Sequence, residues 1–161
     1  TPNKNAYSKL EKEHFSKEFG PRFAEVERKN TKDLKKLLKI YDWFVISRFG
    51  AEADRNAWLI AQHEDQQPEF QMQVLEILAS LYKSNETSPQ NYAYLFDRVA
   101  ASFMDPSKQT LQRYGTQGSC VGPGRWEPIP IEDPEKIDAR RAEVGLGTLA
   151  DYIANFKDVC R

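Results

Sequence analysis

Apolar residues recur at helical spacing along most of the chain, and the most apolar short run is Ala57–Ala61. Glutamine, histidine, glutamate and aspartate follow this run at residues 62–65. A buried segment therefore carries titratable side chains at its C-terminal end. Pro68 ends one helix and begins the next, because its fixed φ angle suits a first helical turn. The pattern therefore predicts a helix over residues 51–64, with His63 near its end, and a second helix that runs to Tyr82.

Further amphipathic segments are expected on both sides of this corner, with apolar residues three or four positions apart. They cover residues 6–19, 23–29, 31–41, 88–103, 133–144 and 148–156. Gly20-Pro21 is expected to separate the first two, because proline removes a backbone donor. Asn30-Thr31 is expected to cap the third. The aromatic stretch Trp43–Gly50 predicts a buried connection.

Glycine and proline become frequent between residues 112 and 130, too frequent for a continuous helix. Gln112–Gln117 and Arg125–Ile129 are expected to form two short strands, joined by a loop over residues 118–124. The predicted fold class is therefore mainly α: a compact multi-helix domain with a small β-hairpin or irregular Gly/Pro-rich insertion.

A single domain is expected over residues 1–161, because a chain of this length can bury a sizeable core. It divides into N-terminal helices (1–50), a central helical core (51–104), a hairpin or loop insertion (105–131) and C-terminal helices (132–161).

Composition narrows the class of protein. The chain is 40% hydrophobic and 29% charged, which excludes a disordered chain, and no apolar run is long enough to span a membrane. The net charge of -1 argues against a nucleic-acid binder that neutralises phosphates. Residues 1–50 nevertheless hold 12 Lys/Arg against 7 Asp/Glu, and the remainder holds 11 against 17. A solvated basic helix face is favoured over a patch for an acidic partner.

The first residue is Thr1 rather than methionine. A cleaved signal peptide would explain that start and would place the protein in the periplasm or outside the cell; without one, a cytoplasmic location is expected. Cys120 and Cys160 allow one disulfide in an oxidising compartment, and two free thiols are the alternative. The disulfide would tie the C-terminal end to the glycine-rich loop and stabilise the fold by about 2–4 kcal/mol.

His63 is the candidate catalytic base, because a neutral imidazole near an apolar helix accepts a proton when an acid orients it. Asp65 is close in sequence, and Asp97 would meet His63 if the helix over residues 88–103 packs beside the central one. The alternative is a partly buried histidine that closes the helix end by bonding a carbonyl.

No metal or cofactor is predicted. Structural zinc needs four Cys or His ligands, and the chain has two of each at unsuitable spacings. The glycine-rich stretch lacks the following Lys-Ser/Thr of a phosphate-binding loop, and there is no Gly-x-Ser-x-Gly elbow for a serine nucleophile.

Gln112, Tyr114 and Gln117 supply donors and acceptors without charge, and the glycine between them permits a positive φ angle. They would bind a polar ligand or fasten the hairpin to a helix, and the second interpretation is favoured. Arg98 and Arg141 are candidates to neutralise an anionic part of a substrate. For Arg141 a salt-bridged helix face is the safer interpretation.

Several blocks of polar and apolar residues follow one another along the chain. They are Asn56–His63 with Asp65 and Phe70-Gln71, then Asp97-Arg98, Gln112 with Tyr114–Gln117, and Asp138–Arg141 with Gly145-Leu146. Together they resemble the signature of a bacterial family classed as a domain of unknown function, over roughly residues 41–154. The chain departs from it at Asp42–Phe44, where members often show Gly-Trp-Pro. The resemblance implies no activity. It implies that seven polar residues recur: His63, Asp97, Arg98, Gln112, Tyr114, Gln117 and Arg141.

Three hypotheses for this polar cluster follow, and each expects His63, Asp97 and part of residues 112–117 around one cleft. The first is a hydrolase-like acid–base enzyme that acts on a small polar or anionic substrate, with His63 as base. The second is a non-catalytic ligand- or protein-binding or effector module, with an unknown small molecule or protein as partner. The third is that the cluster only locks the hairpin to the helices. The sequence does not decide whether the protein is an enzyme.

Overall fold

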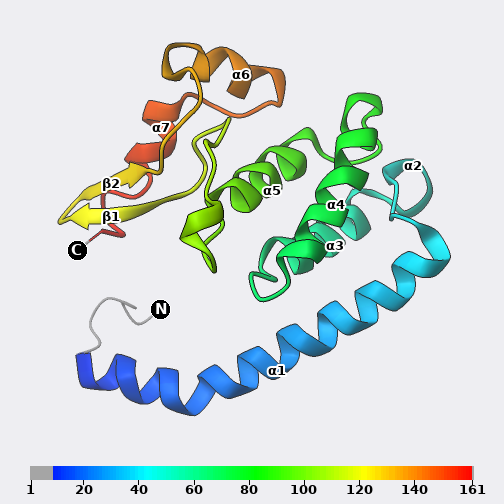
Figure 1. Cartoon of the computed structure of the whole chain (residues 1–161), viewed down its shortest axis with the longest axis horizontal. Helices are drawn as coiled ribbons and strands as arrows, with labels where there is room; N and C mark the ends of the chain where they lie inside the picture. The colour runs from blue at the N-terminus through cyan, green and yellow to red at the C-terminus, as the bar shows by residue number, and fades with distance from the viewer. Residues whose placement is uncertain (1–8, 161) are drawn as a thin grey trace.

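The computed structural model describes residues 9–160, with the backbone alone for residues 9–16, and it is built mainly of helices (Figure 1). The helices are α1 (Lys9–Tyr41), α2 (Ile46–Phe49), α3 (Ala51–Gln62), α4 (Pro68–Leu81), α5 (Pro89–Ala101), α6 (Ile137–Glu143) and α7 (Leu149–Ala154). Short 3-10 turns cover Tyr82–Ser84, Pro106–Lys108 and Pro134–Lys136. Two antiparallel strands, β1 (Gly118–Gly122) and β2 (Arg125–Pro128), complete the fold. The predicted mainly α class with a small hairpin is confirmed.

The core lies where α3, α4 and α5 pack against one another. Ala61 of α3, Val74 and Leu78 of α4, and Leu95 of α5 have no exposed surface. Figure 1 shows α1 along one side of this group, while the hairpin and α7 lie to the left of α5 and α6 lies above it. The three apolar stripes therefore bury one another, as their helical spacing predicts.

Helix α1 continues through Gly20-Pro21, so the predicted break there is wrong. Proline removes only one hydrogen bond of the helix, and the residues on either side keep the helical path. The predicted cap at Asn30-Thr31 is also wrong, because Thr31 lies inside α1. The predicted start of the first helix falls on residues 6–8, which lie outside the described residues. None of the helices in the described residues carries an apolar stretch long enough to cross a membrane.

The corner between α3 and α4 holds the C-terminal half of α1. The buried hydroxyl of Thr31 donates to the buried carboxylate of Glu64. Lys35 donates to Gln67, and its ammonium lies 4.7 Å from the ring centre of Phe70. The Thr31 side chain therefore bonds Glu64, far along the chain, and does not cap a helix.

Asp54 joins three separate segments from a position with 1% exposure. Its carboxylate accepts hydrogen bonds from the indole of Trp43 at 2.8 Å, the hydroxyl of Thr87 at 2.6 Å, the backbone of Ser88 at 3.1 Å and the amide of Asn91 at 2.9 Å. The connection after α1, which contains α2, is therefore fixed to α3 and to the start of α5 through one carboxylate. The predicted burial of this connection holds only for Trp43, because α2 has no buried residue.

The first strand of the hairpin is shifted along the chain relative to its prediction, whereas β2 lies where the second strand was expected. Strand β1 occupies the stretch expected to be the loop, and Gln112–Gln117 is not a strand. Only Gln112 makes a strand-like contact, an isolated bridge to Ile131. Glycine is required at position 118, the first residue of β1, because a Cβ atom there would lie 2.2 Å from the carbonyl oxygen of Glu127. The close approach therefore lies at the open end of the hairpin, where β1 begins opposite the end of β2.

A disulfide joins Cys120 of β1 to Cys160, with their Cα atoms 5.3 Å apart. Next to it, the ring of Trp126 in β2 stacks on Phe156 with a centroid distance of 4.6 Å. The backbone of Gly124 donates to the carbonyl of Cys160. The C-terminal segment is thus fastened to the hairpin by a covalent bond, a ring stack and a hydrogen bond.

We predict that replacing Cys120 and Cys160 together by serine lowers the free energy of unfolding by about 2–4 kcal/mol, because the unfolded chain regains the freedom of the closed loop. Urea unfolding of oxidised parent and variant measures this difference. Reduction of the parent should reproduce the loss, and equal midpoints for oxidised and reduced parent would contradict it.

Candidate functional site

Asp97 has no exposed surface and lies on the face of α5 that meets residues 112–117. One carboxylate oxygen accepts from the backbone N–H groups of Arg113 at 2.8 Å and Tyr114 at 3.1 Å. The other accepts from the backbone and hydroxyl of Thr116 at 2.8 and 2.9 Å. Burial raises the pKa of the Asp97 carboxyl, and these four donors oppose that rise. Both oxygens are occupied, so Asp97 organises a loop.

This bonding explains why Gln112–Gln117 is not a strand. The three N–H groups that bond Asp97 are not available to a neighbouring strand. Gln112, also fully buried, closes the loop from inside. Its amide nitrogen donates to the carbonyls of Gln117 and Ile129, and its amide oxygen accepts from the backbone of Gln117.

Arg98, the next residue of α5, connects the loop to the corner after α3. Its guanidinium forms a bidentate ion pair with the carboxylate of Asp65, in which the Nε–Oδ1 distance is 2.8 Å. A third nitrogen donates to the side-chain oxygen of Gln117 at 3.1 Å. Gln71 of α4 donates to Asp65 at 3.3 Å and to the carbonyl of Ala61 at 3.1 Å. The corner, α4, α5 and the loop therefore meet at the Arg98–Asp65 pair.

Arg141 of α6 is 1% exposed. The sequence predicted that it binds an anion or forms a salt bridge, whereas in the structure its guanidinium bonds backbone carbonyls. It donates to the carbonyls of Tyr114 and Gly147, and its guanidinium carbon lies 5.0 Å from the ring centre of Tyr152. Its neighbour Arg140 donates to three further carbonyls, those of Arg113, Glu132 and Asp133. The two arginines hold α6 against the loop.

Tyr114 places its ring among other aromatic side chains instead of toward solvent. It lies edge-on to Tyr92 and Phe96, with centroid distances of 6.4 and 6.1 Å. Burial, and next to it the neighbouring Tyr92, raises the pKa of the Tyr114 hydroxyl to about 12. Burial likewise raises the pKa of Tyr152 above its ordinary value.

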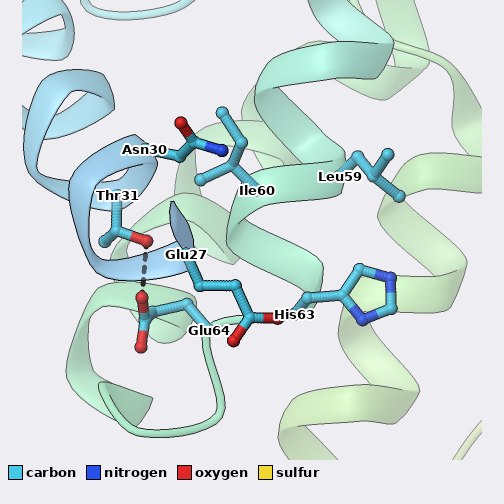
Figure 2. A pocket seen from close by; sticks show the side chains of 7 residues that line it. All are labelled: Glu27, Asn30, Thr31, Leu59, Ile60, His63 and Glu64. Atoms are coloured by element: carbon cyan, nitrogen blue, oxygen red, sulfur yellow. Dashed lines mark hydrogen bonds between the residues drawn. The ribbon is translucent and has the colours of Figure 1, made fainter. Parts of the chain in front are cut away.

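His63 lies apart from this network. It is the exposed C-cap of α3 and borders a cavity of about 190 Å³ between α1 and α3, which we call the His63 cleft. The cleft is lined by Glu27, Asn30, Thr31, Leu59, Ile60, His63 and Glu64. In Figure 2 the imidazole points away from the Thr31–Glu64 pair. The predicted convergence on one cleft is therefore wrong. Asp97 and residues 112–117 bond one another in a buried network, and none of them lines the His63 cleft.

The Arg98–Asp65 pair reaches the surface in a second cavity of about 290 Å³, which we call the Arg98 pocket. Its walls come from α4, the end of α5 and residues 102–110. They include the apolar side chains of Met72, Val99, Phe103 and Met104, of which all but Val99 are about half exposed. Two of the predicted site residues therefore border a space that a ligand can enter.

Sequence reasoning missed the hydrogen-bonding roles of Asp54, Glu64 and Arg140. A signal existed for Asp54, because it shares one face of α3 with Ala57 and Ala61, both buried. An acid on an apolar face requires buried donors. For Glu64 and Arg140 the partners lie far away along the chain, and no local pattern indicates them.

A family model whose description is "family of unknown function (DUF6624)" matches residues 12–160. The chain belongs to the DUF6624 family. The match begins inside α1 and ends at Cys160, so it extends beyond the stretch over which the motifs resemble a family. No curated protein and no solved structure gives a significant match. Membership in DUF6624 therefore supplies a family and no activity.

We predict that Asp97→Asn lowers the free energy of unfolding by at least about 2 kcal/mol, because the new amide N–H₂ would face backbone donors. His63→Ala should change it by less than about 0.5 kcal/mol, because the imidazole is exposed. Chemical denaturation measures both. Asp42→Asn is the matched control, an exposed aspartate whose substitution should be neutral. A neutral Asp97→Asn would contradict the role of this carboxylate.

The raised pKa of Tyr114 predicts how the stability of the fold changes at alkaline pH. The free hydroxyl ionises near pH 10, whereas the folded one ionises near 12, so its contribution to stability is complete below pH 10 and is lost as the pH rises to about 12. The free energy of unfolding of Tyr114→Phe should fall less steeply with pH over that window. Urea unfolding at several pH values measures the slope, and identical slopes would refute the assignment.

Proposed function

We propose that the protein is a non-catalytic binding module that takes a small amphipathic organic anion in the Arg98 pocket. The observation that carries the proposal is the composition of this pocket. A partly exposed arginine lines it beside apolar side chains, two of them methionines. Of the three carboxylates in the lining, Asp65 pairs with Arg98, Asp105 pairs with Lys108, and Glu69 is exposed. Cavities that bind small molecules combine mostly apolar walls with a few polar groups that fix orientation.

Arg98 has donor capacity left for such a ligand. A guanidinium carries five N–H donors, and three of them are used by Asp65 and Gln117. Its side chain is 21% exposed, and its guanidinium carbon lies 4.6 Å from the ring centre of Phe103. The arginine is thus held in place on three sides before any ligand arrives, which lowers the entropy cost of binding.

The apolar walls supply the second half of the recognition. Met72 and Phe103 belong to different elements, α4 and the segment after α5, and methionine side chains adapt to ligands of irregular shape. A carboxylate or sulfonate would accept from Arg98, while its hydrocarbon part would cover Met72, Phe103 and Met104. Burial of that surface would contribute most of the affinity.

The contacts support this proposal over an acid–base enzyme that uses His63. A histidine acts as base when a carboxylate orients it within hydrogen-bond distance. The two carboxylates predicted for that task, Asp97 and Asp65, bond the loop and Arg98. Neither of them lines the His63 cleft. Binding that depends on Arg98 and not on His63 would distinguish the two hypotheses.

The test uses the fluorescent anion anilinonaphthalene sulfonate as probe and octanoate as competitor. We expect saturable fluorescence that octanoate reverses. Met72→Asp should weaken probe binding by about tenfold or more, because it removes apolar contact and adds a like charge to the wall. His63→Ala should leave the affinity unchanged.

Val26→Asp is the matched control, since Val26 lies on α1 with 55% exposure against 51% for Met72. It should bind the probe as the parent does, and the melting temperatures of both variants should be compared with the parent to exclude unfolding. Equal affinities for Met72→Asp and parent, or equal losses in both variants, would overturn the proposal.

A further inference from the structure

A third cavity, of about 440 Å³, lies between the N-terminal parts of α3 and α5, and we call it the Trp58 groove. It is lined by Ile46, Ala51, Asp54, Arg55, Trp58, Ser88, Gln90, Asn91 and Tyr94. None of these residues lines the Arg98 pocket or the His63 cleft. The groove is therefore a separate space, and an inference about it does not depend on the proposed function.

Aromatic rings form one side of the groove. Trp58 of α3 and Tyr94 of α5 lie with centroids 6.1 Å apart and planes tilted by 60°. The indole nitrogen of Trp58 is buried and has no hydrogen-bond partner among the described residues. Tryptophan and tyrosine in the wall of a groove offer flat apolar faces against which the C–H face of a sugar ring packs.

Amide oxygens supply the polar side. Asn91 donates through its nitrogen to Asp54, and Gln90 donates through its nitrogen to the carbonyl of Gly145 at 2.7 Å. These bonds fix both amides by their nitrogens. Within the described residues no group donates to the two amide oxygens, so each is an acceptor for an incoming hydroxyl.

Charge in the groove is divided between its floor and its rim. The carboxylate of Asp54 at the floor is 1% exposed and already accepts from four donors. Arg55, one residue further along α3, is exposed and forms no ion pair within the described part of the chain. An anionic group is therefore favoured at the rim beside Arg55 and disfavoured at the floor.

We infer that the Trp58 groove binds a sugar ring that bears a carboxylate, that is, a uronate. The ring packs on Trp58, its hydroxyls donate to the amide oxygens of Gln90 and Asn91, and its carboxylate accepts from Arg55. Each of these three recognition elements is met by a different chemical feature of one small molecule.

Heteronuclear NMR tests this inference, because the indole N–H signal of Trp58 reports directly on the groove. Trp58→Phe identifies the signal by its disappearance. We expect titration with glucuronate to move it in a saturable way, and the signal of Trp126 in the distant hairpin to stay in place. Glucose, which lacks the carboxylate, should bind at least about tenfold more weakly, the change expected for one lost charge-assisted hydrogen bond.

Arg55→Gln should weaken glucuronate binding by about tenfold as well, whereas Arg28→Gln, at an exposed arginine on α1, should not change it. An unmoved Trp58 signal at high glucuronate would overturn the inference. So would equal binding of glucose, or an unchanged affinity in Arg55→Gln. Benzoate that binds as tightly as glucuronate would overturn the assignment to a sugar.

Discussion

The second half of the molecule depends on the buried carboxylate of Asp97. A buried carboxylate is costly unless donors surround it, and here three backbone N–H groups and one hydroxyl come from residues 113–116. Only a chain that curls can direct three N–H groups at one carboxylate, and Gly115 allows this with a φ angle of 66°. The requirement to satisfy Asp97 therefore takes these residues out of the sheet and sets where β1 begins.

The same device occurs at the other end of α5, where Asp54 gathers Trp43, Thr87, Ser88 and Asn91. One buried aspartate thus fixes the start of α5 to α3, and the other fixes its later part to the loop before the hairpin. Both carboxylates are fully bonded, and the sites that we propose lie beside them. Arg98 and Arg55 are the neighbours in sequence of the two aspartates, so rigid anchors place both arginines.

Features of the fold that depend on residues close together in the sequence could be predicted, and those that depend on distant residues could not. The packing of α3, α4 and α5 was predictable because helical spacing of Leu78 and Leu95 is a local signal. The continuation of α1 through Pro21 and the position of β1 were not, because neighbours in space override local preference. The motif blocks indicated that Asp97, Arg98 and Gln117 matter together. Their spacing could not say that Asp97 bonds backbone, nor that His63 opens away from it.

The most direct measurement of the central claim is amide hydrogen exchange of residues 112–117. If Asp97 holds this loop as described, the N–H groups of Arg113, Tyr114 and Thr116 should exchange as slowly as those in the core of α5, because they open only when the fold opens. The exposed residues that follow, Ser119 and Val121, provide an internal comparison in the hairpin. Exchange of the three amides at the rate of an unstructured loop would contradict the account.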